Sequence, residues 1–598
     1  MTAFRKVSWL WHRLRAMPPQ EIAGRVKVKA QEWTSTATLR TLDDFVLGAV
    51  ESSSMRLPAK DKAPAKLREA VKDRRAWLFG WKDVPVGDAP NWNLDPLHGV
   101  EVPAEVLNHR ELPDGADARC VWELSRWSEV VRLAQDGWLN ENPDALRQAQ
   151  QWVQDWLEKN PASKSIHWRS PLEGALRLIN FCWIDALVRA CGEAEIIAEQ
   201  DRLAQALVPL HAWWVWRKRS FGSSANNHLI GELAALVMVT RRWPSLAKVI
   251  CCPERLWPML EEEVLRQFAE DGGNKEQALH YHLFAWEMAW QAGRVMDGLQ
   301  GPVLKRLKEA AQFFCNLSLG SWDFGDSDDA QVTPFTMDRR DAEREWRAWM
   351  LGEEDGAALA FWLGEAPRVI MPVKGKWITH AASGHAIWRD ETWTARVDAS
   401  PLGFGTLAAH GHLDAMHVSL WSDGKALVVD PGTGAYYGDV ALRASLAAWE
   451  AHNGPVPLCG RSVPMRAGPF LWREHHDVPK MEIVDDACVV RFACDGPFTK
   501  RSVQMAGRSA CITDEVCGRT AHGVTWQLAP EWSVEAVEAH GFLLKHREGA
   551  TATLRVAGDA IRTCEIVASR VSPRFGEVCE AAGVRITFTG RLASTFSL

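Results

Sequence analysis

Residues 416–434 read MHVSLWSDGKALVVDPGTG and place two short runs rich in β-branched and apolar residues around Asp423-Gly424. A two-residue Asp-Gly step between such runs predicts a β hairpin with a type I′ turn. Similar segments continue toward the C-terminus, such as MEIVDDACVVRFACD (481–495) and GVRITFTGRL (583–592). We therefore expect residues 370–598 to form an antiparallel β-sandwich domain.

The chain before this region has a helical periodicity. In PLEGALRLINFCWIDALVRAC (171–191), the apolar residues at helical spacing are Leu172, Leu176, Ile179, Ile184 and Leu187. Several such amphipathic runs follow one another with short polar turns between them, which predicts antiparallel helix pairs. We expect an all-α domain over residues 111–365, preceded over residues 1–110 by a helical extension and linker.

Length and composition narrow the function classes. The 598 residues exceed the ~250–300 that one core supports, so at least two domains are expected. The formal net charge of −7 gives no general attraction to nucleic acid, and no apolar run reaches the ~18 residues of a membrane span. Thirteen cysteines without a C-x-x-C pair indicate reduced, buried thiols.

The first 20 residues, MTAFRKVSWLWHRLRAMPPQ, carry basic residues that interrupt the apolar positions. They contain no secretory cleavage pattern, so we expect a cytoplasmic protein. The apolar positions fit either a docking helix with a basic outer face or a helix on a membrane surface. These positions are Phe4, Val7, Leu10, Trp11 and Leu14.

The segment RKRSFGSSANNHLIGELAAL (217–236) combines a basic cluster with a predicted helix start. Ser223 or Ser224 is a suitable N-cap for a helix that begins near Ala225. His228 and Glu232 would then share one helix face. Amides, an imidazole and nearby cations at a helix start predict a carboxylate-binding corner, and the alternative is a capped helix with an ordinary polar surface.

The segment DGGNKEQALHYHLF (271–284) contains Tyr281, one of only three tyrosines beside 32 tryptophans and 20 phenylalanines. Asn274 is a suitable N-cap with Gln277 as its capping-box partner. A helix dipole and nearby cations would favour the phenolate of Tyr281. Because tryptophan and phenylalanine supply the packing aromatics elsewhere, we expect a function for this hydroxyl, the alternative being a packing aromatic.

The hairpin and its approach, residues 408–439, gather imidazoles and carboxylates. These groups are His410, His412, Asp414, His417 and Asp430. Two histidines and a carboxylate are ordinary zinc ligands, and His452 is a candidate third ligand. A two-residue turn sets His417 opposite Asp430, whereas His412 needs a bulge or bend to reach Asp430. The alternative is a polar hairpin with solvated histidines.

Seven segments occur in the order typical of the heparinase II/III-like polysaccharide lyases, which this chain resembles over most of its length. The segments are NLDPLHGVEVP, WELSRWSEVVRLAQ, HWRSPLEGALRLINFCW, NNHLIGELAAL, DGGNKEQALHYHL, the 410–439 segment and AHNG. The resemblance implies a multidomain α+β protein, with an N-terminal (α/α) toroid, often an incomplete barrel, followed by antiparallel β-sheets. It also implies β-elimination on a uronic-acid-containing polysaccharide, with C5 proton abstraction, departure of the C4 oxygen and an unsaturated product.

The resemblance also implies residue roles. Tyr281 would be the central acid/base, His410 a second one, and Asn227 or His228 would contact the uronate carboxylate. A structural metal, commonly zinc, would be held by His412, Asp430 and His452, with His417 as a rival to His412. The further residues expected to bind substrate are Arg217, Arg219, Asn226, Glu232, Gln277, Tyr436 and Tyr437.

Two other functions are compatible with these residues. A uronyl C5-epimerase would share C5 deprotonation but return the proton to the opposite face. A non-catalytic polysaccharide-binding protein would keep the cleft without turnover. The expected partner is an acidic polysaccharide, with heparan, chondroitin, hyaluronan, alginate and a bacterial exopolysaccharide all open as identities.

Overall fold

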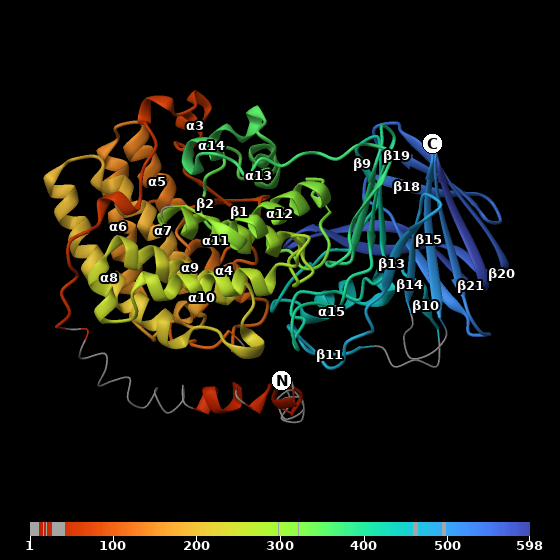
Figure 1. Cartoon of the computed structure of the whole chain (residues 1–598), viewed down its shortest axis with the longest axis horizontal. Coiled ribbons are helices and arrows are strands. Elements are labelled where there is room, and N and C mark those ends of the chain that lie inside the picture. The colour runs from red at the N-terminus through yellow and green to blue at the C-terminus, as the bar shows by residue number, and fades with distance from the viewer. Residues whose placement is uncertain are drawn as a thin grey trace.

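The computed structural model shows a helical domain beside a β domain (Figure 1). It describes residues 11–598 except 16, 20, 27–41, 43, 110, 297, 321, 459–463 and 493–497. The helices of the first domain end at Leu363 and the first strand of the second begins at Trp377. The expected order, a helical toroid that is not a closed barrel followed by an antiparallel sandwich, is confirmed.

The helical domain is built from successive helices joined mostly by short connections. Their bounds are α4 (Ala118–Leu124), α5 (Ser128–Leu139), α6 (Pro143–Lys159), α7 (Pro171–Arg189), α8 (Ala194–Lys218), α9 (Asn227–Arg242), α10 (Pro253–Gln267), α11 (Leu279–Val295), α12 (Gly301–Leu317), α13 (Ala342–Leu351) and α14 (Ala357–Leu363). Most bury an apolar face, and prolines stand at the first turn of α6, α7, α10 and α12, where a missing N–H costs nothing.

Helices α5, α7, α9 and α11 pack side by side and begin at the same end of the domain. Arg126, just before α5, pairs with Glu173 in the first turn of α7 at 2.8 Å. At the other end, Asp185 of α7 pairs with Arg242 at the close of α9. Polar residues at the starts of these helices therefore converge, together with the positive ends of the helix dipoles.

The described part of residues 1–110 is not only helical. It contains α3 (Ala65–Ala70) and two antiparallel pairs, β1 (Arg75–Leu78) with β2 (Lys82–Pro85), and β3 (Leu94–Asp95) with β4 (Val100–Glu101). Phe4, Val7 and Leu10 of the expected N-terminal helix lie outside the described residues. Trp11 and Leu14 are exposed, and instead Arg13 donates to Ser223 Oγ at 2.6 Å, so the contact on the helical domain is polar.

The β domain opens with a five-stranded antiparallel meander. Its strands are β5 (Trp377–His380), β6 (His385–Arg389), β7 (Trp393–Asp398), β8 (Val418–Ser422) and β9 (Lys425–Val428). Ser422 pairs with Lys425 across the β8–β9 turn, and Asp423 and Gly424 have φ values of 47° and 75°. This confirms the hairpin and its Asp-Gly turn, which needs positive φ at both central residues.

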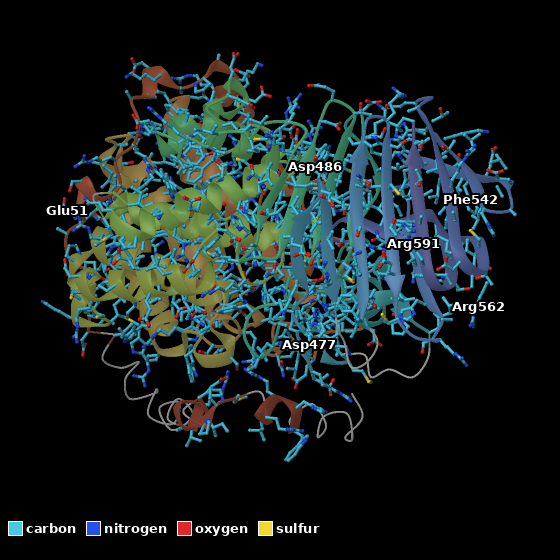
Figure 2. All side chains as sticks on the ribbon, turned by 45° about the vertical axis from the view of Figure 1, so that its right-hand side comes forward. Glu51, Asp477, Asp486, Phe542, Arg562 and Arg591 are labelled. Carbon is cyan, nitrogen blue, oxygen red and sulfur yellow. The ribbon has the colours of Figure 1, made fainter. Side chains whose placement is uncertain are left out.

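A ten-stranded antiparallel sheet covers the meander. Its strands are β10 (Val456–Pro457), β13 (Lys480–Val484), β14 (Ala487–Phe492), β15 (Thr499–Ala506), β16 (Ser509–Val516), β17 (His522–Gln527), β18 (Trp532–Glu538), β19 (Gly541–His546), β20 (Thr551–Arg574) and β21 (Glu577–Ser597). One apolar core joins the two sheets, and Phe542 of β19 and Arg562 of β20 lie on the side of the β domain away from the helices (Figure 2).

The connection between the sheets carries the short elements α15 (Val440–Leu446), β11 (Arg466–Gly468) and β12 (Leu471–Trp472). In Figure 1, α15 and β11 lie where the two domains meet. The buried apolar core of the helical domain includes Tyr436 and Phe575 of the β domain, so the domains are packed together. Among the described residues, no helix combines the length and apolarity needed to cross a bilayer, and the cysteines are free thiols.

Candidate active site

The site centres on three aromatic side chains at the domain junction. Tyr281 lies in the first turn of α11, and its hydroxyl is 2.8 Å from the hydroxyl of Tyr436. The ring of His410 stacks on Tyr281 with centroids 3.8 Å apart. Tyr281 and His410 are each only 5% exposed. The lone tyrosine of the helical domain therefore meets an imidazole and a second phenol of the β domain.

Asp326 orients this cluster. Its buried carboxylate lies 3.1 Å from His410 Nδ1, 3.0 Å from His412 Nε2 and 2.9 Å from Arg443 Nη1. Burial opposes ionisation, but Arg443 and the two imidazoles hold the pKa of Asp326 well below its usual value. An ionised carboxylate only accepts hydrogen bonds, so His410 Nδ1 and His412 Nε2 carry the protons. In the neutral form of each ring, the lone pair is then on the opposite nitrogen, Nε2 of His410 and Nδ1 of His412.

The start of α9 is bound to a second carboxylate. Glu276 accepts hydrogen bonds from the backbone N–H of Asn227 at 2.7 Å and from its Nδ2 at 3.0 and 2.9 Å. Asn226 Nδ2 adds a longer contact of 3.4 Å, and His410 Nε2 lies 3.5 Å from Glu276. Burial raises the pKa of Glu276. The amide donors of Asn227 are therefore engaged, whereas its buried Oδ1 has no hydrogen-bond partner.

The phenol of Tyr281 is neutral in this setting. Burial and the negative charge of Asp328 raise the pKa of Tyr281 well above its usual value. The expectation that the helix dipole and cations would favour its phenolate is therefore wrong, because nearby positive charge is already neutralised. Arg119, for example, donates to Asp328 at 2.7 Å. A neutral phenol is a proton donor.

His228 follows Asn227 in the first turn of α9, and His410 influences its pKa. Burial is the main cause that lowers the pKa of His228 to about 4, and the electrostatic influence of the nearby His410 acts in the same direction. At neutral pH this imidazole is uncharged and can donate one hydrogen bond to an anion without carrying a charge itself.

His412, Asp430 and His452 form a buried cluster with the chemistry of a metal site. Their ligand atoms lie within 4.8 Å of one another. His412 Nδ1, Asp430 Oδ2 and His452 Nε2 are buried without a hydrogen-bond partner. His452 Nδ1 donates to the carbonyl of Ala448 at 2.8 Å, which directs its Nε2 lone pair into the cluster. Orphaned lone pairs on a His₂Asp set fit zinc coordination.

His417 does not belong to this set. Its Nε2 lies 3.1 Å from Ser419 Oγ and its Nδ1 accepts from the backbone of Asn453 at 3.4 Å. A bulge between Leu420 and Trp421 shifts the hairpin register, because Leu420 pairs with Val428. The expected placement of His417 opposite Asp430 is therefore wrong. His412 lies in the irregular segment before β8, and its ligand nitrogen comes within 4.8 Å of the Asp430 and His452 ligand atoms.

A second group of ligand types, Asp95, His98 and Cys120, also lies together. However, Asp95 Oδ1 accepts from the backbone of Leu97 and His98, at 2.9 and 3.0 Å. Its Oδ2 accepts from His98 Nδ1 and from the backbone of Asp117, both at 2.8 Å. These carboxylate oxygens shape a turn and are not orphaned as Asp430 is.

Several predicted substrate-binding residues make contacts inside the protein and lie outside the Tyr281–His410–Tyr436 cluster. Glu232 is fully buried and accepts from the backbone and hydroxyl of Ser220. Gln277 joins the β domain, donating to the Ser383 carbonyl at 3.2 Å and lying 3.0 Å from His385 Nε2. The guanidinium groups of Arg217 and Arg219 lie over the rings of Trp213 and Trp216.

The predicted helix starts also need correction. Asn226, not Ser223 or Ser224, caps α9, which begins at Asn227. Asn274 and Gln277 precede α11, whose N-cap is Ala278. Gln277 has a φ of 55°, which a helical turn excludes, so the segment before Tyr281 forms a loop against the β domain.

The loop that carries Tyr436 is fixed from the helical domain. Asp117 Oδ2 accepts the backbone N–H groups of Tyr436, Tyr437 and Gly438 at 2.9, 2.8 and 3.0 Å. Tyr437 packs on His109, with centroids 4.8 Å apart. Tyr436, by contrast, points its hydroxyl at Tyr281.

The sequence analysis missed the charged residues that organise the site: Arg119, Arg126, Glu173, Glu276, Asp326, Asp328 and Arg443. Arg126 and Glu173 stand in the segments WELSRW and SPLEG, which were noted only for their resemblance. Asp326 and Asp328 stand in DFGDSDD, where acidic density was a usable signal. The sequence around Arg443 contains no local pattern that distinguishes it from an ordinary helical arginine.

Comparisons with known proteins agree with this architecture. The sequence matches the family models "Heparinase II/III N-terminus" over residues 62–301 and "Heparinase II/III-like, C-terminal" over residues 378–597. The comparison with curated proteins gives no match.

Solved structures share the fold. A crystal structure of heparinase III superposes with a TM-score of 0.63 at 15% identity, covering 98% of this chain and 93% of that one. The heparinase III gene product BT4657 gives a TM-score of 0.58 at 16% identity over 98% and 92%. A mutant heparan sulfate lyase HepC from Pedobacter heparinus gives 0.56 at 16% identity over 91% and 86%. With both family models matched and this fold shared, the chain belongs to the heparinase II/III-like family of polysaccharide lyases.

Proposed function

We propose that this enzyme cleaves a uronic-acid-containing polysaccharide by β-elimination. The observation that carries the proposal is the contact of Tyr281 with His410 and Tyr436. The His410 ring is itself oriented by Asp326, which accepts a hydrogen bond from its Nδ1. β-Elimination needs a base for the C5 proton and an acid for the departing C4 oxygen, and the cluster supplies both.

Geometry and burial divide the two roles. We assign the C5 proton to Nε2 of His410, because Asp326 orients the ring through Nδ1 and leaves Nε2 on the other side. Tyr281 is a neutral phenol, so it donates to the C4 oxygen as the C4–O bond breaks. The electron pair of the C5–H bond becomes the C4–C5 double bond. Each group is expected to contribute ~10²–10⁴-fold to the rate, and Tyr436 positions the Tyr281 hydroxyl through their hydrogen bond.

Negative charge that develops on the uronate carboxylate must be stabilised by donors. Because Glu276 engages the donors of Asn227, we assign the contact with this carboxylate to His228, which is neutral and half-buried. Asn226 and Asn227 act through Glu276 by holding the start of α9 in place. Among glycans, the proposal covers any chain whose cleaved unit carries a C5 carboxylate.

His412, Asp430 and His452 would hold the metal, and their donor types favour zinc. When bound, the ion supplies positive charge that ties the hairpin to the Trp449–Ala451 turn, which is a structural role. Asp326 orients both His412 and His410, so the residues of the metal site and the proton-transfer residue share one hydrogen-bonding partner.

The test is a Tyr281→Phe variant assayed on heparan sulfate, chondroitin sulfate, hyaluronan and alginate. We expect the wild type to form ultraviolet-absorbing unsaturated ends on at least one glycan, and the variant to lose this by at least ~10²-fold while remaining folded, at a cost of about 1–3 kcal/mol for the lost hydrogen bond to Tyr436. Tyr437→Phe removes the same atom from a neighbouring tyrosine and should retain most activity. Full turnover by Tyr281→Phe, or C5 hydrogen exchange without chain cleavage, would contradict the proposal.

A further inference from the structure

A cavity lies beside the starts of α7 and α9, outside the cluster formed by Tyr281, His410 and Tyr436. Its volume is about 550 Å³, within the ~300–1,000 Å³ typical of ligand sites. Its walls come from the loop before α7, the end of α8 and the 219–224 loop. Pro171 in its wall is two residues from Glu173, and Ser224 is three residues from Asn227. The cavity therefore borders the segments that build the active site.

The charge of this cavity has one sign. Among its described lining residues, the ionisable ones are all cationic: Arg25, Arg169, Lys218 and Arg219. The chain as a whole carries a net charge of −7, so this concentration of cations does not follow from composition. A concave surface lined by cations raises the local concentration of anions, and arginine binds carboxylate and sulfate groups well because its donors form a planar fork.

Two of these cations are held in position. The guanidinium of Arg219 lies 3.8 Å from the centroid of the Trp216 ring and donates to the Trp216 carbonyl. Arg25 is fixed by Glu21 at 2.7 Å and by Ser224 Oγ at 2.6 Å. Side chains that are already ordered lose less entropy when an anion binds.

The remaining walls fit a sugar ring. Trp168, Trp214 and Phe221 belong to the cavity wall. The Trp168 and Trp214 rings are largely buried, with centroids 5.4 Å apart at 85°, and the guanidinium of Arg25 lies 5.4 Å from the centroid of the Phe221 ring. Aromatic faces pack against the C–H face of a pyranose. Ser165 Oγ, buried in the same wall, has no hydrogen-bond partner in the protein and is available to a ligand hydroxyl.

We propose that this cavity is a remote subsite for an anionic sugar unit of the polysaccharide substrate, beyond the unit at the cleaved bond. The ligand is a pyranose that carries a carboxylate or a sulfate. The proposal rests on the proposed function in assigning the ligand to the same glycan chain, but binding to the cavity can be measured without cleavage.

The binding experiment uses Tyr281→Phe protein, so that no turnover interferes. Its probes are alginate hexasaccharide, which carries only carboxylates, heparan sulfate hexasaccharide, which also carries sulfates, and cellohexaose, which is neutral. The test variant adds Arg169→Ala and Lys218→Ala. The control matched in charge adds Lys305→Ala and Lys308→Ala, which remove two exposed lysines of α12. We expect the test variant to bind an anionic probe at least 10-fold more weakly, with reduced salt dependence, while the control binds like its parent and cellohexaose does not bind.

Preference between the two anionic probes identifies the charged group. No binding of either anionic probe to the parent, or equal affinities in test and control variants, would overturn the subsite. In otherwise wild-type protein, the same two substitutions should lower kcat/KM for long chains and leave it unchanged for the shortest cleavable oligosaccharide. A structural defect would lower both. Cavity-dependent binding without unsaturated products from wild type would refute the lyase proposal alone, whereas cleavage with unchanged affinities would refute the subsite alone.

Discussion

Replacing Asp326 by asparagine should disable the site through its geometry, although the side chain does not touch the sugar in our proposal. The carboxylate accepts from His410, His412 and Arg443. An amide keeps one acceptor oxygen and turns an NH₂ group toward the remaining donors. At least one imidazole therefore loses its acceptor, and Arg443 is left buried without its counter-charge.

The magnitudes follow from these contacts. Removing one partner of a buried ion pair costs about 3–5 kcal/mol of unfolding free energy, and the Asp326–Arg443 pair is fully buried. Loss of the acceptor frees His410 to rotate or to change tautomer. Replacing the carboxylate of a serine protease triad by an amide costs ~10⁴-fold in kcat, so we expect a loss of ~10²–10⁴-fold here.

Initial rates of unsaturated-product formation, zinc content and thermal unfolding should be measured together. The control is Asp185→Asn, which neutralises a buried carboxylate held by Arg189 and Arg242 in the helical domain. Both variants should lose stability, but only Asp326→Asn should lose turnover and also bind zinc ~10–100-fold more weakly, because His412 loses its orienting partner. Tyr281→Phe should lose turnover and keep its zinc. If Asp326→Asn turned over at the wild-type rate, or lost no more than Asp185→Asn, the shared orienting role would be refuted.

Two further substitutions probe the packing and the titration of the helical domain and hairpin approach. A Cβ at Gly411 would lie 1.5 Å from the Leu402 carbonyl oxygen, so Gly411→Ala should cost ~1–3 kcal/mol of unfolding free energy. By shifting His410 and His412 it should also reduce turnover and zinc content together, whereas Gly523→Ala should reduce neither turnover nor zinc content. Retained turnover and zinc content in Gly411→Ala would show that the backbone relaxes without moving the two histidines. Burial raises the pKa of Glu232 to about 8 from 4.5. Between these values the folded state binds more protons than the unfolded state, so the free energy of unfolding falls as pH rises, by up to ~1.4 kcal/mol per pH unit from this group. In the Glu232→Gln variant the urea midpoint should therefore depend less on pH, and an unchanged dependence would contradict the prediction.

The sequence predicted the features that depend on local periodicity. Helical spacing in 171–191 and the Asp-Gly turn at 423–424 each reflect interactions between near neighbours, so they can be read without a tertiary model. Tyr281 stood out for a different reason, since tryptophan and phenylalanine do the packing in this chain. The order of the two domains followed from these signals.

What the sequence did not predict is set by partners far apart in the chain. Asn274 is a reasonable cap by type, yet the segment before α11 is held by Ser383 and His385 of the β domain, and this tertiary contact overrides the local preference. Glu232 was expected to bind substrate, but its side chain is buried and accepts a hydrogen bond from the backbone N–H of Ser220. His412 lies in the non-strand segment before β8, so strand parity could not predict its approach to Asp430, and it could not predict the bulge that shifts the hairpin register either.

The acidic segment between α12 and α13 links the two domains at the proposed proton-transfer site. Asp326 and Asp328 are two residues apart, yet Asp326 binds β-domain groups such as Arg443 while Asp328 binds Arg119 of the helical domain. The Asp326 backbone also donates to the His410 carbonyl at 3.0 Å, and Ser327 N–H to Thr433 Oγ at 2.7 Å. A movement that separates the domains would therefore part Tyr281 from His410, and the segment could not keep both its Asp326–Arg443 and its Asp328–Arg119 contacts. The same few hydrogen bonds thus set the distance between the proposed acid and base and the charge around them, so that the chemistry depends on the closed junction.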